Sequence, residues 1–263
     1  MQTTKRPPFE KITQEGYDVR TGEYIGQAWD LVKAHMGLFI GYTLLFFLIK
    51  GFLSIIPGVG GIAQAILAPA LTVGFAAAAH KASIGQKPEL SDCFGGFSQI
   101  GNLFLVNLLI SLIAVVCFVP LVAGLVFLLL NADGGYINSL DDFVDVIVDL
   151  LVNPIFLISM FVSLALILAI SALFIFAPYY VFFYQMSATE AMRTSYEVAK
   201  IRLGGLIGFN IVLGLLLFGG AILCGIGLIF VYPIAMVAIY LAFANINDLQ
   251  SEQPVDLDKH LID

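Results

Sequence analysis

The residue in this chain best placed for chemistry is a lysine inside an apolar run. Lys50 is the one cation within a stretch long enough to span a bilayer. A lysine at mid-bilayer costs about 2.5 to 3.5 kcal/mol on insertion scales, so its position calls for a reason. The side chain either snorkels to the nearer interface and joins a structural ion pair, or serves as a substrate or proton site. The sequence leaves both interpretations open.

Three regularly spaced aspartates form the second candidate. Asp141, Asp145 and Asp149 lie at i, i+4 spacing on an amphipathic helix predicted over residues 139–152. Their mutual repulsion would be eased by a bound divalent cation. A solvated face resting on the outer leaflet explains the same stripe, and the stripe lacks the glycine turn of a loop calcium site. We therefore predict no metal site here.

Other reactive residue types are scattered. The histidines are His35, His80 and His260, and the cysteines are Cys93, Cys117 and Cys224, without an H-E-x-x-H or C-x-x-C pattern. The sequence also has no nucleophile beside a base and no phosphate-binding loop. We expect no enzymatic activity and no cofactor.

Composition places these residues in a membrane protein. Hydrophobic residues make up 60% of the chain and charged residues 12%, and the mean hydropathy is +0.97. Soluble domains have far fewer hydrophobic residues and more charged ones. The sequence also lacks the cluster of basic residues that would bind nucleic acid. Spans need about twenty apolar residues each. We predict an all-α, polytopic transmembrane bundle of six spans, over residues 37–56, 62–80, 101–130, 155–184, 205–223 and 226–244.

The third and fourth runs are unusually long. About thirty residues of helix measure roughly 45 Å, more than one upright span requires. Pro120 and Pro178 lie within these runs and predict a kink in each.

The distribution of charge predicts the orientation. Eleven of the twelve Lys and Arg residues, all except Lys50, fall in polar stretches on one side of a six-span arrangement. The other side receives an acidic segment, residues 131–153, with five aspartates and no cation. The positive-inside rule then places both termini in the cytoplasm. Cations flanking the spans also predict contact with anionic lipid headgroups.

The chain contains an internal repeat. A shift of 167 positions aligns Glu23 with Glu190, Trp29 with Tyr196, Lys33 with Lys200, Gly58 with Gly225 and Gly60 with Gly227. Each copy begins with an amphipathic segment predicted to lie at the interface, packed on lipid or on the spans. Ser187 with Glu190 has the form of a capping box. A weaker middle copy begins near Leu90.

This pattern divides the chain into repeats that enter the membrane from the same side. The predicted units are about residues 21–80, 89–184 and 187–246, within a membrane domain over residues 21–249. Residues 1–20 and 250–263 form cytoplasmic tails.

Four segments carry a resemblance to a known group of proteins. They are Gly37 to Tyr42, Glu89 to Phe97, Ala191 to Tyr196 and Gly225 to Leu228. The chain resembles a broad group of uncharacterised bacterial six-span membrane proteins, which is similar to the membrane domain of some glycerophosphodiester phosphodiesterases. The resemblance implies an inner-membrane protein without an established activity. The phosphodiesterase domain itself is not present in the sequence.

Two classes of function follow from these observations. A non-catalytic scaffold or assembly factor of the cell envelope, in contact with lipid, agrees with the interfacial segments and the lack of a reactive cluster. Its partners would be a membrane protein or further copies of the chain. A small-solute transporter or channel agrees with the repeat and Lys50, although the predicted spans contain no Asp or Glu.

Overall fold

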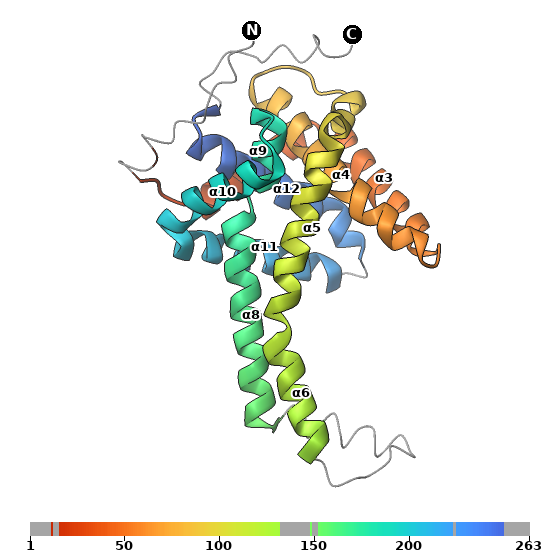
Figure 1. Cartoon of the computed structure of the whole chain (residues 1–263). Coiled ribbons are helices and arrows are strands. Elements are labelled where there is room, and N and C mark those ends of the chain that lie inside the picture. Colours follow the sequence, from red (N-terminus) through yellow and green to blue (C-terminus); the bar gives the residue numbers. More distant parts are fainter. Residues whose placement is uncertain (1–11, 13–15, 132–147, 149–151, 223–224, 250–263) are drawn as a thin grey trace. The chain divides into compact units, whose positions relative to one another are not determined.

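The described part of the chain is helical throughout. A computed structural model describes residues 12, 16–131, 148, 152–222 and 225–249, which form helices and no strands (Figure 1). Six helical stretches among these residues are long and apolar enough to cross a membrane. The prediction of an all-α, multi-pass membrane protein is confirmed. The helices are α2 (Thr21–Ala34), α3 (Met36–Ser54), α4 (Val59–Ser83), η1 (Leu90–Gln99), α5 (Ile100–Cys117), α6 (Val119–Asn131), α8 (Pro154–Phe174), α9 (Ala177–Tyr184), α10 (Ala188–Ala199), η2 (Lys200–Arg202), α11 (Leu203–Ile222) and α12 (Ile226–Ile246).

The two predicted proline kinks are confirmed. The third run is interrupted at Phe118, between α5 and α6 and just before Pro120. The fourth is interrupted after Phe174, and α9 begins at Ala177 with Pro178 in its first turn. Proline has no N–H and its ring collides with the preceding turn, so each run divides into two helices.

The chain divides into two compact units, described here separately. The first, which we call the body, comprises the described parts of Met1–Leu108 and Ala172–Asp263. The second, which we call the hairpin, is the described part of Leu109–Ser171.

Small residues hold the two helices of the hairpin together. The backbone N–H of Leu121 donates a hydrogen bond of 3.1 Å to Ser163 Oγ, which is buried. This bond satisfies a donor at the break next to Pro120. A side-chain carbon added at Gly124 would collide with the Ser159 hydroxyl. Glycine at this position therefore lets α6 and α8 approach closely.

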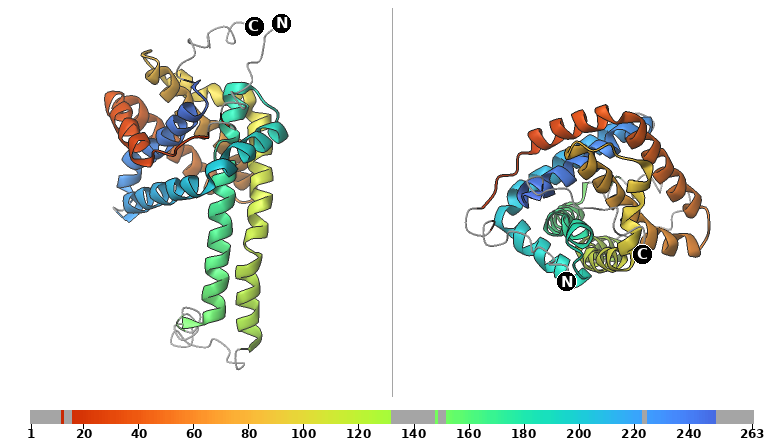
Figure 2. Two further views of the ribbon diagram at one scale, coloured as in Figure 1. Left: turned by 90° about the vertical axis from the view of Figure 1, so that its left-hand side faces the viewer. Right: turned by 90° about the horizontal axis from the view of Figure 1, so that it is seen from above.

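Three short helices of the body each precede a span, and each packs on a span of another predicted repeat unit. These pre-span helices are α2, η1 and α10. α2 packs on α12, η1 packs on α4 and α10 packs on α9. Both views in Figure 2 show α2 running beside α12, from opposite ends of the chain. Thus η1 and α10 each pack on the second span of the preceding predicted unit. The helix α2 belongs to the first unit and packs on the second span of the last unit.

The contact between η1 and α4 depends on glycine. A side-chain carbon at Gly96 would collide with the backbone of Ala70, and one at Gly74 would collide with the Cys93 carbonyl oxygen. The Tyr42 hydroxyl lies 2.9 Å from that same oxygen and 2.7 Å from the Leu71 carbonyl oxygen. The glycines of η1, which disfavour a regular α-helix, permit this close packing of a 3-10 helix.

Helices 167 positions apart begin at equivalent residues. α10 begins at Ala188, α11 at Leu203 and α12 at Ile226, which correspond to Thr21, Met36 and Val59 at the starts of α2, α3 and α4.

The turns between these helices also correspond. Gly58 and Gly225 have positive φ angles of 74° and 76° before α4 and α12. Only glycine adopts that conformation without steric cost. A carbon added at Gly60 would collide with the Leu53 carbonyl, and one at Gly227 would crowd the backbone of Gly220. The paired glycines therefore have the same role in each hairpin turn.

The helices α2 and α10 each bury one face and expose another. Tyr24, Ala28 and Val32 are buried on α2, whereas Trp29 is 48% exposed. On α10, the N-cap residue Ser187 accepts a hydrogen bond from the Glu190 N–H, as its sequence predicted. Its equivalent of Trp29, Tyr196, is 45% exposed. These helices therefore pack on other helices of the body and also present an aromatic residue outwards.

Candidate functional site

The strongest cluster of polar side chains lies where α4, α9 and α12 converge. His80 Nδ1 lies 2.8 Å from the Tyr240 hydroxyl, which lies 3.2 Å from Ser83 Oγ. The Ser83 hydroxyl donates to the His80 carbonyl oxygen at 2.9 Å. All three contacts can be hydrogen bonds at once. In that arrangement the imidazole N–H donates to the Tyr240 hydroxyl, the Tyr240 hydroxyl donates to Ser83 Oγ, and the Ser83 hydroxyl donates to the His80 carbonyl. These bonds connect α4 to α12.

A second buried bond connects α12 to α9. The Tyr180 hydroxyl donates to Asn247 Oδ1 at 3.0 Å, and Asn247 Nδ2 donates to the Phe243 carbonyl at 2.9 Å. Asn247 is 167 positions after His80, so the two bonds occupy equivalent places in the first and last units. Tyr180, Tyr240 and Asn247 are all at most 2% exposed.

Aromatic rings fill the space between these bonds. The Phe243 ring contacts Phe176, Tyr180 and Phe183, with ring centroids 5.0–5.8 Å apart. The His80 ring meets Phe183 edge to face at 5.3 Å. We call this cluster, formed by His80, Phe176, Tyr180, Phe183, Tyr240, Phe243 and Asn247, the aromatic junction. It is a packed interior in which the polar atoms bond each other.

Charged residues border the body near the same helix ends. Lys81 Nζ lies 2.7 Å from Asp92 Oδ1, and the two side chains are 19% and 12% exposed. Asp92 Oδ2 also accepts the Glu89 N–H at 2.7 Å, in a capping box that begins η1. This largely buried pair attaches η1 to the end of α4.

The segment before α2 reaches across to the last repeat. Arg202 lies 3.2 Å from the Asp18 carboxylate and donates to the Tyr17 carbonyl at 3.0 Å. The Tyr17 hydroxyl donates to the Val198 carbonyl at 3.1 Å. We call residues 16–20 the N-terminal strap, because they join the start of α2 to the end of α10.

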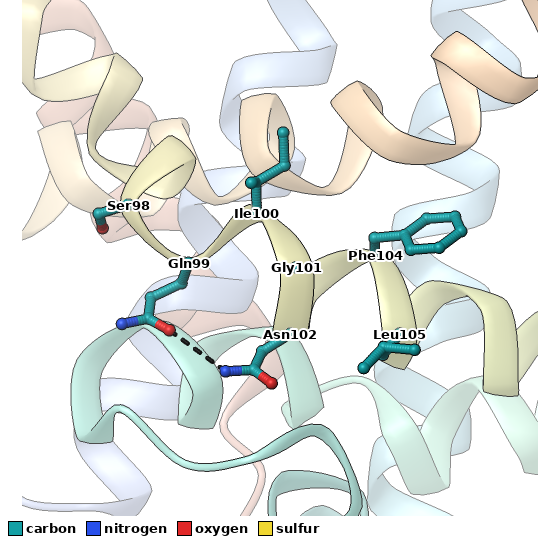
Figure 3. Close-up of a pocket in the computed structure, with 7 residues that line it drawn as sticks. All are labelled: Ser98, Gln99, Ile100, Gly101, Asn102, Phe104 and Leu105. Atoms are coloured by element: carbon teal, nitrogen blue, oxygen red, sulfur yellow. Dashed lines mark hydrogen bonds between the residues drawn. The ribbon is translucent and has the colours of Figure 1, made fainter.

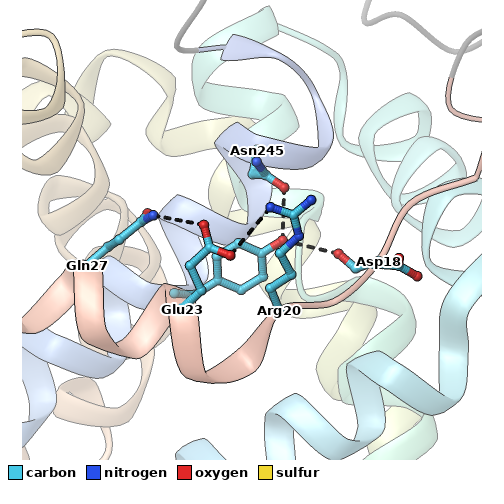
Figure 4. A network of polar contacts seen from close by, with 6 residues as sticks. Asp18, Arg20, Glu23, Gln27 and Asn245 are labelled. Carbon is cyan, nitrogen blue, oxygen red and sulfur yellow. Dashed lines mark hydrogen bonds and ion pairs between the residues drawn. The ribbon is translucent and has the colours of Figure 1, made fainter.

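Tyr24 continues this network into α12. Its hydroxyl lies 3.0 Å from Asn245 Oδ1 and 3.3 Å from the Asp18 carbonyl oxygen, beside the Arg20–Glu23 ion pair (Figure 4). Burial raises the pKa of Tyr24 and also that of Tyr17. Both phenols therefore remain neutral hydrogen-bond donors at physiological pH.

Lys50 lies apart from these groups. Its Nζ is 5.4 Å from the centroid of the Phe46 ring, a cation–π contact, and its carbonyl accepts a hydrogen bond from Gln64 Nε2. Among the described residues, no carboxylate lies within ion-pair distance of Lys50. The second sequence candidate, the stripe of Asp141, Asp145 and Asp149, lies outside the described residues, as does most of the helix predicted over residues 139–152.

The remaining sequence candidates do not converge. His80 is buried in the aromatic junction, His35 lies between α2 and α3, and His260 is outside the described residues. Cys93 and Cys117 are free and buried. Within the described part of the chain, no three His, Cys, Asp or Glu side chains could hold a metal together.

A surface depression of about 500 Å³ lies where η1 meets α5. The Asn102 amide donates to Gln99 Oε1 at 3.4 Å across it, and no lining residue is titratable (Figure 3). Its lining residues are Ser98, Gln99, Ile100, Gly101, Asn102, Phe104 and Leu105. A depression lined by one segment can accommodate an apolar chain or a neutral polar group.

Sequence reasoning missed the aromatic junction. It considered His80 only as a metal ligand and did not single out Tyr240. The available signal was the recurrence of a polar residue, His80 and Asn247, at equivalent positions near the ends of two apolar spans.

Comparison with known protein families, with curated protein sequences and with solved structures finds no match to this chain. The resemblance to the bacterial six-span group therefore stays a prediction.

Proposed function

We propose that this chain is a non-catalytic, multi-pass protein of the bacterial inner membrane that scaffolds or helps to assemble other envelope proteins. The observation that carries the proposal is the aromatic junction. There the second spans of the body meet through buried hydrogen bonds and packed rings, so the interior forms a rigid support. The apolar and aromatic groups available for binding lie on the outer surface.

The proposed architecture is a ring of three parallel repeats. Its support is the packing of each pre-span helix on the preceding unit, together with the equivalent helix starts and glycine turns. Both termini are cytoplasmic in this proposal, on the side that carries eleven of the twelve cations.

Contact with anionic lipid is part of the same proposal. Trp29 and Tyr196 are exposed on equivalent helices, and each has a lysine four positions later, Lys33 and Lys200. Lys200 Nζ lies 5.5 Å from the centroid of the Tyr196 ring. An aromatic ring at the interface with a cation beside it suits an acidic headgroup.

Purification in native lipid nanodiscs, followed by chemical cross-linking and mass spectrometry, tests the proposal. We expect the same membrane-protein partners in independent preparations. We also expect Trp29→Ala with Tyr196→Ala to lower the anionic lipid retained, relative to a matched Leu48→Ala variant on the exposed face of α3. Preparations without a reproducible protein or lipid partner would contradict the proposal.

Transport of a small solute is the second candidate, and Lys50 favours it. This cation lies on a membrane-spanning helix without an ion-pair partner among the described residues. Flux of ions, metabolites and lipid into liposomes tests the idea, with Lys50→Met as the informative variant. Absence of any flux would eliminate this candidate, and flux unchanged in Lys50→Met would remove Lys50 from the mechanism.

A further inference from the structure

The depression beside η1 has an equivalent place in the last predicted unit. A shift of 103 positions aligns the start of α5, Ile100, with the start of α11, Leu203. The aligned pairs that share residue type or burial are Gly101 with Gly204, Leu103 with Leu206, Val106 with Phe209, and Asn107 with Asn210. The two spans therefore begin in the same register.

A non-helical segment of polypeptide covers this place in the last unit. Arg202 and Gly205, which correspond to Gln99 and Asn102 of the depression, both contact the N-terminal strap. The Arg202 side chain donates to a carbonyl oxygen of the strap at 3.0 Å. A side-chain carbon added at Gly205 would lie 3.0 Å from the side chain of Val19 in the strap. The junction of a pre-span helix with its span thus binds polypeptide in the last unit.

The same junction of the middle unit is open. Among the described residues, only members of the segment 98–105 line the depression of about 500 Å³. The Asn102 amide donates to Gln99 Oε1, which leaves Gln99 Nε2 and Asn102 Oδ1 without a bond to any described residue (Figure 3). A free donor and a free acceptor therefore lie at opposite ends of one amide pair.

The lining chemistry favours a peptide backbone over a phospholipid. A non-helical chain presents N–H and C=O groups along one edge, and these match a free acceptor and a free donor. Phosphate and ester oxygens only accept hydrogen bonds, so they would leave Asn102 Oδ1 unsatisfied. No lining residue is titratable, so the depression offers no charge to a phosphate or to an acidic side chain. Arg202, by contrast, forms an ion pair with Asp18 of the strap.

We infer that the depression at Gln99 and Asn102 is a docking site for a neutral, non-helical segment of a partner polypeptide. This segment lies against the start of α5 as the strap lies against the start of α11. Gln99 Nε2 donates to one of its carbonyl groups, and Asn102 Oδ1 accepts from one of its N–H groups. Phe104 and Leu105 contact an apolar side chain in the role of Val19. The inference rests on the proposed function, because the partner is one of the envelope proteins that this chain would assemble.

A short peptide based on the strap tests the inference with the purified protein. The probe is the capped peptide Gly-Tyr-Asn-Val, which has the sequence of residues 16–19 with asparagine in place of Asp18. Phe104 is replaced by photoreactive p-benzoylphenylalanine, and the protein in nanodiscs is illuminated with the peptide at millimolar concentration. Intact mass distinguishes a peptide adduct from a lipid adduct. We expect the peptide adduct.

Gln99→Glu is the informative variant, because it keeps the size of the side chain and removes the free donor. We expect at least about fivefold less peptide adduct, since a hydrogen bond is replaced by an unfavourable contact between two oxygens. Gln27→Glu, at an exposed residue of α2, is the matched control and should leave the yield unchanged.

Lipid adducts alone, or a peptide yield that Gln99→Glu does not lower, would overturn the inference. The native cross-linking described above keeps the two proposals separate. Native partners without a peptide adduct would overturn the docking site alone. A peptide adduct that responds to Gln99→Glu, without any native partner, would support the docking site and contradict the proposed function.

Discussion

His80 and Tyr240, from opposite halves of the chain, bond each other at 2.8 Å in the interior of the body. Asn247, equivalent to His80 in the predicted repeat, accepts a hydrogen bond from the Tyr180 hydroxyl. Buried hydrogen bonds thus connect α12 with α4 and the end of α12 with α9. This arrangement predicts that stability depends on a few hydroxyl groups.

Tyr240→Phe should lower the stability of the folded protein in detergent or lipid. The substitution leaves the buried His80 Nδ1 without its hydrogen-bond partner, and a buried unsatisfied group costs about 1–3 kcal/mol. Thermal unfolding followed by circular dichroism measures the effect. Tyr179→Phe is the matched control, because the Tyr179 hydroxyl has no hydrogen bond among the described residues. An equal effect from both variants would contradict a specific role for the His80 contact.

Gly96→Ala should destabilise the body more than an alanine at Gly101, a nearby glycine at the start of α5. Its new methyl group would collide with the backbone of Ala70, and overpacking costs about 1–3 kcal/mol or more. Gly101→Ala meets no atom within 4 Å and should be neutral or stabilising, because alanine favours a helix. Thermal unfolding measures the stability of both variants. A larger loss of stability in Gly101→Ala than in Gly96→Ala would refute the close packing of η1 on α4.

Sequence alone predicted much of the fold and little of this packing. The spans and both proline kinks follow from local signals, namely apolar length and the missing N–H of proline. The contact of η1 with α4 does not follow from local signals. Gly96 by itself disfavours a helix, and it contributes to the fold only because the absence of a side chain lets the backbone of Ala70 approach. Such a benefit depends on tertiary packing, which no local pattern reports.

The candidate site shows the same limit. His80 and Tyr240 are 160 positions apart, and each alone is an ordinary polar residue near the end of a span. The repeat aligns His80 with Asn247, but it does not indicate that both side chains point inwards. The sequence does single out Lys50, because the signal there is the local cost of a charge in an apolar run.

Arg202→Gln should loosen the N-terminal strap. The substitution removes the ion pair with Asp18 and weakens the bond to the Tyr17 carbonyl. Hydrogen exchange at residues 16–20 should become severalfold faster, since local opening costs less free energy. Arg193→Gln removes an exposed pair within α10 and should leave the strap unchanged. Equal exchange in wild type and Arg202→Gln would show that Arg202 does not hold the strap.

The proposed ring of repeats closes where α2 packs on α12, and a thiol cross-link tests this closure most directly. Tyr24→Cys and Asn245→Cys, in a background without other cysteines, replace two side chains that bond at 3.0 Å. A short bis-maleimide should join them within one chain. The control pair, Tyr24→Cys with Ile226→Cys, should not react, because Ile226 is about 28 Å farther along α12. Efficient intramolecular cross-linking of the first pair alone is the predicted result; no cross-link, or equal cross-linking of both pairs, would contradict a closed ring of repeats.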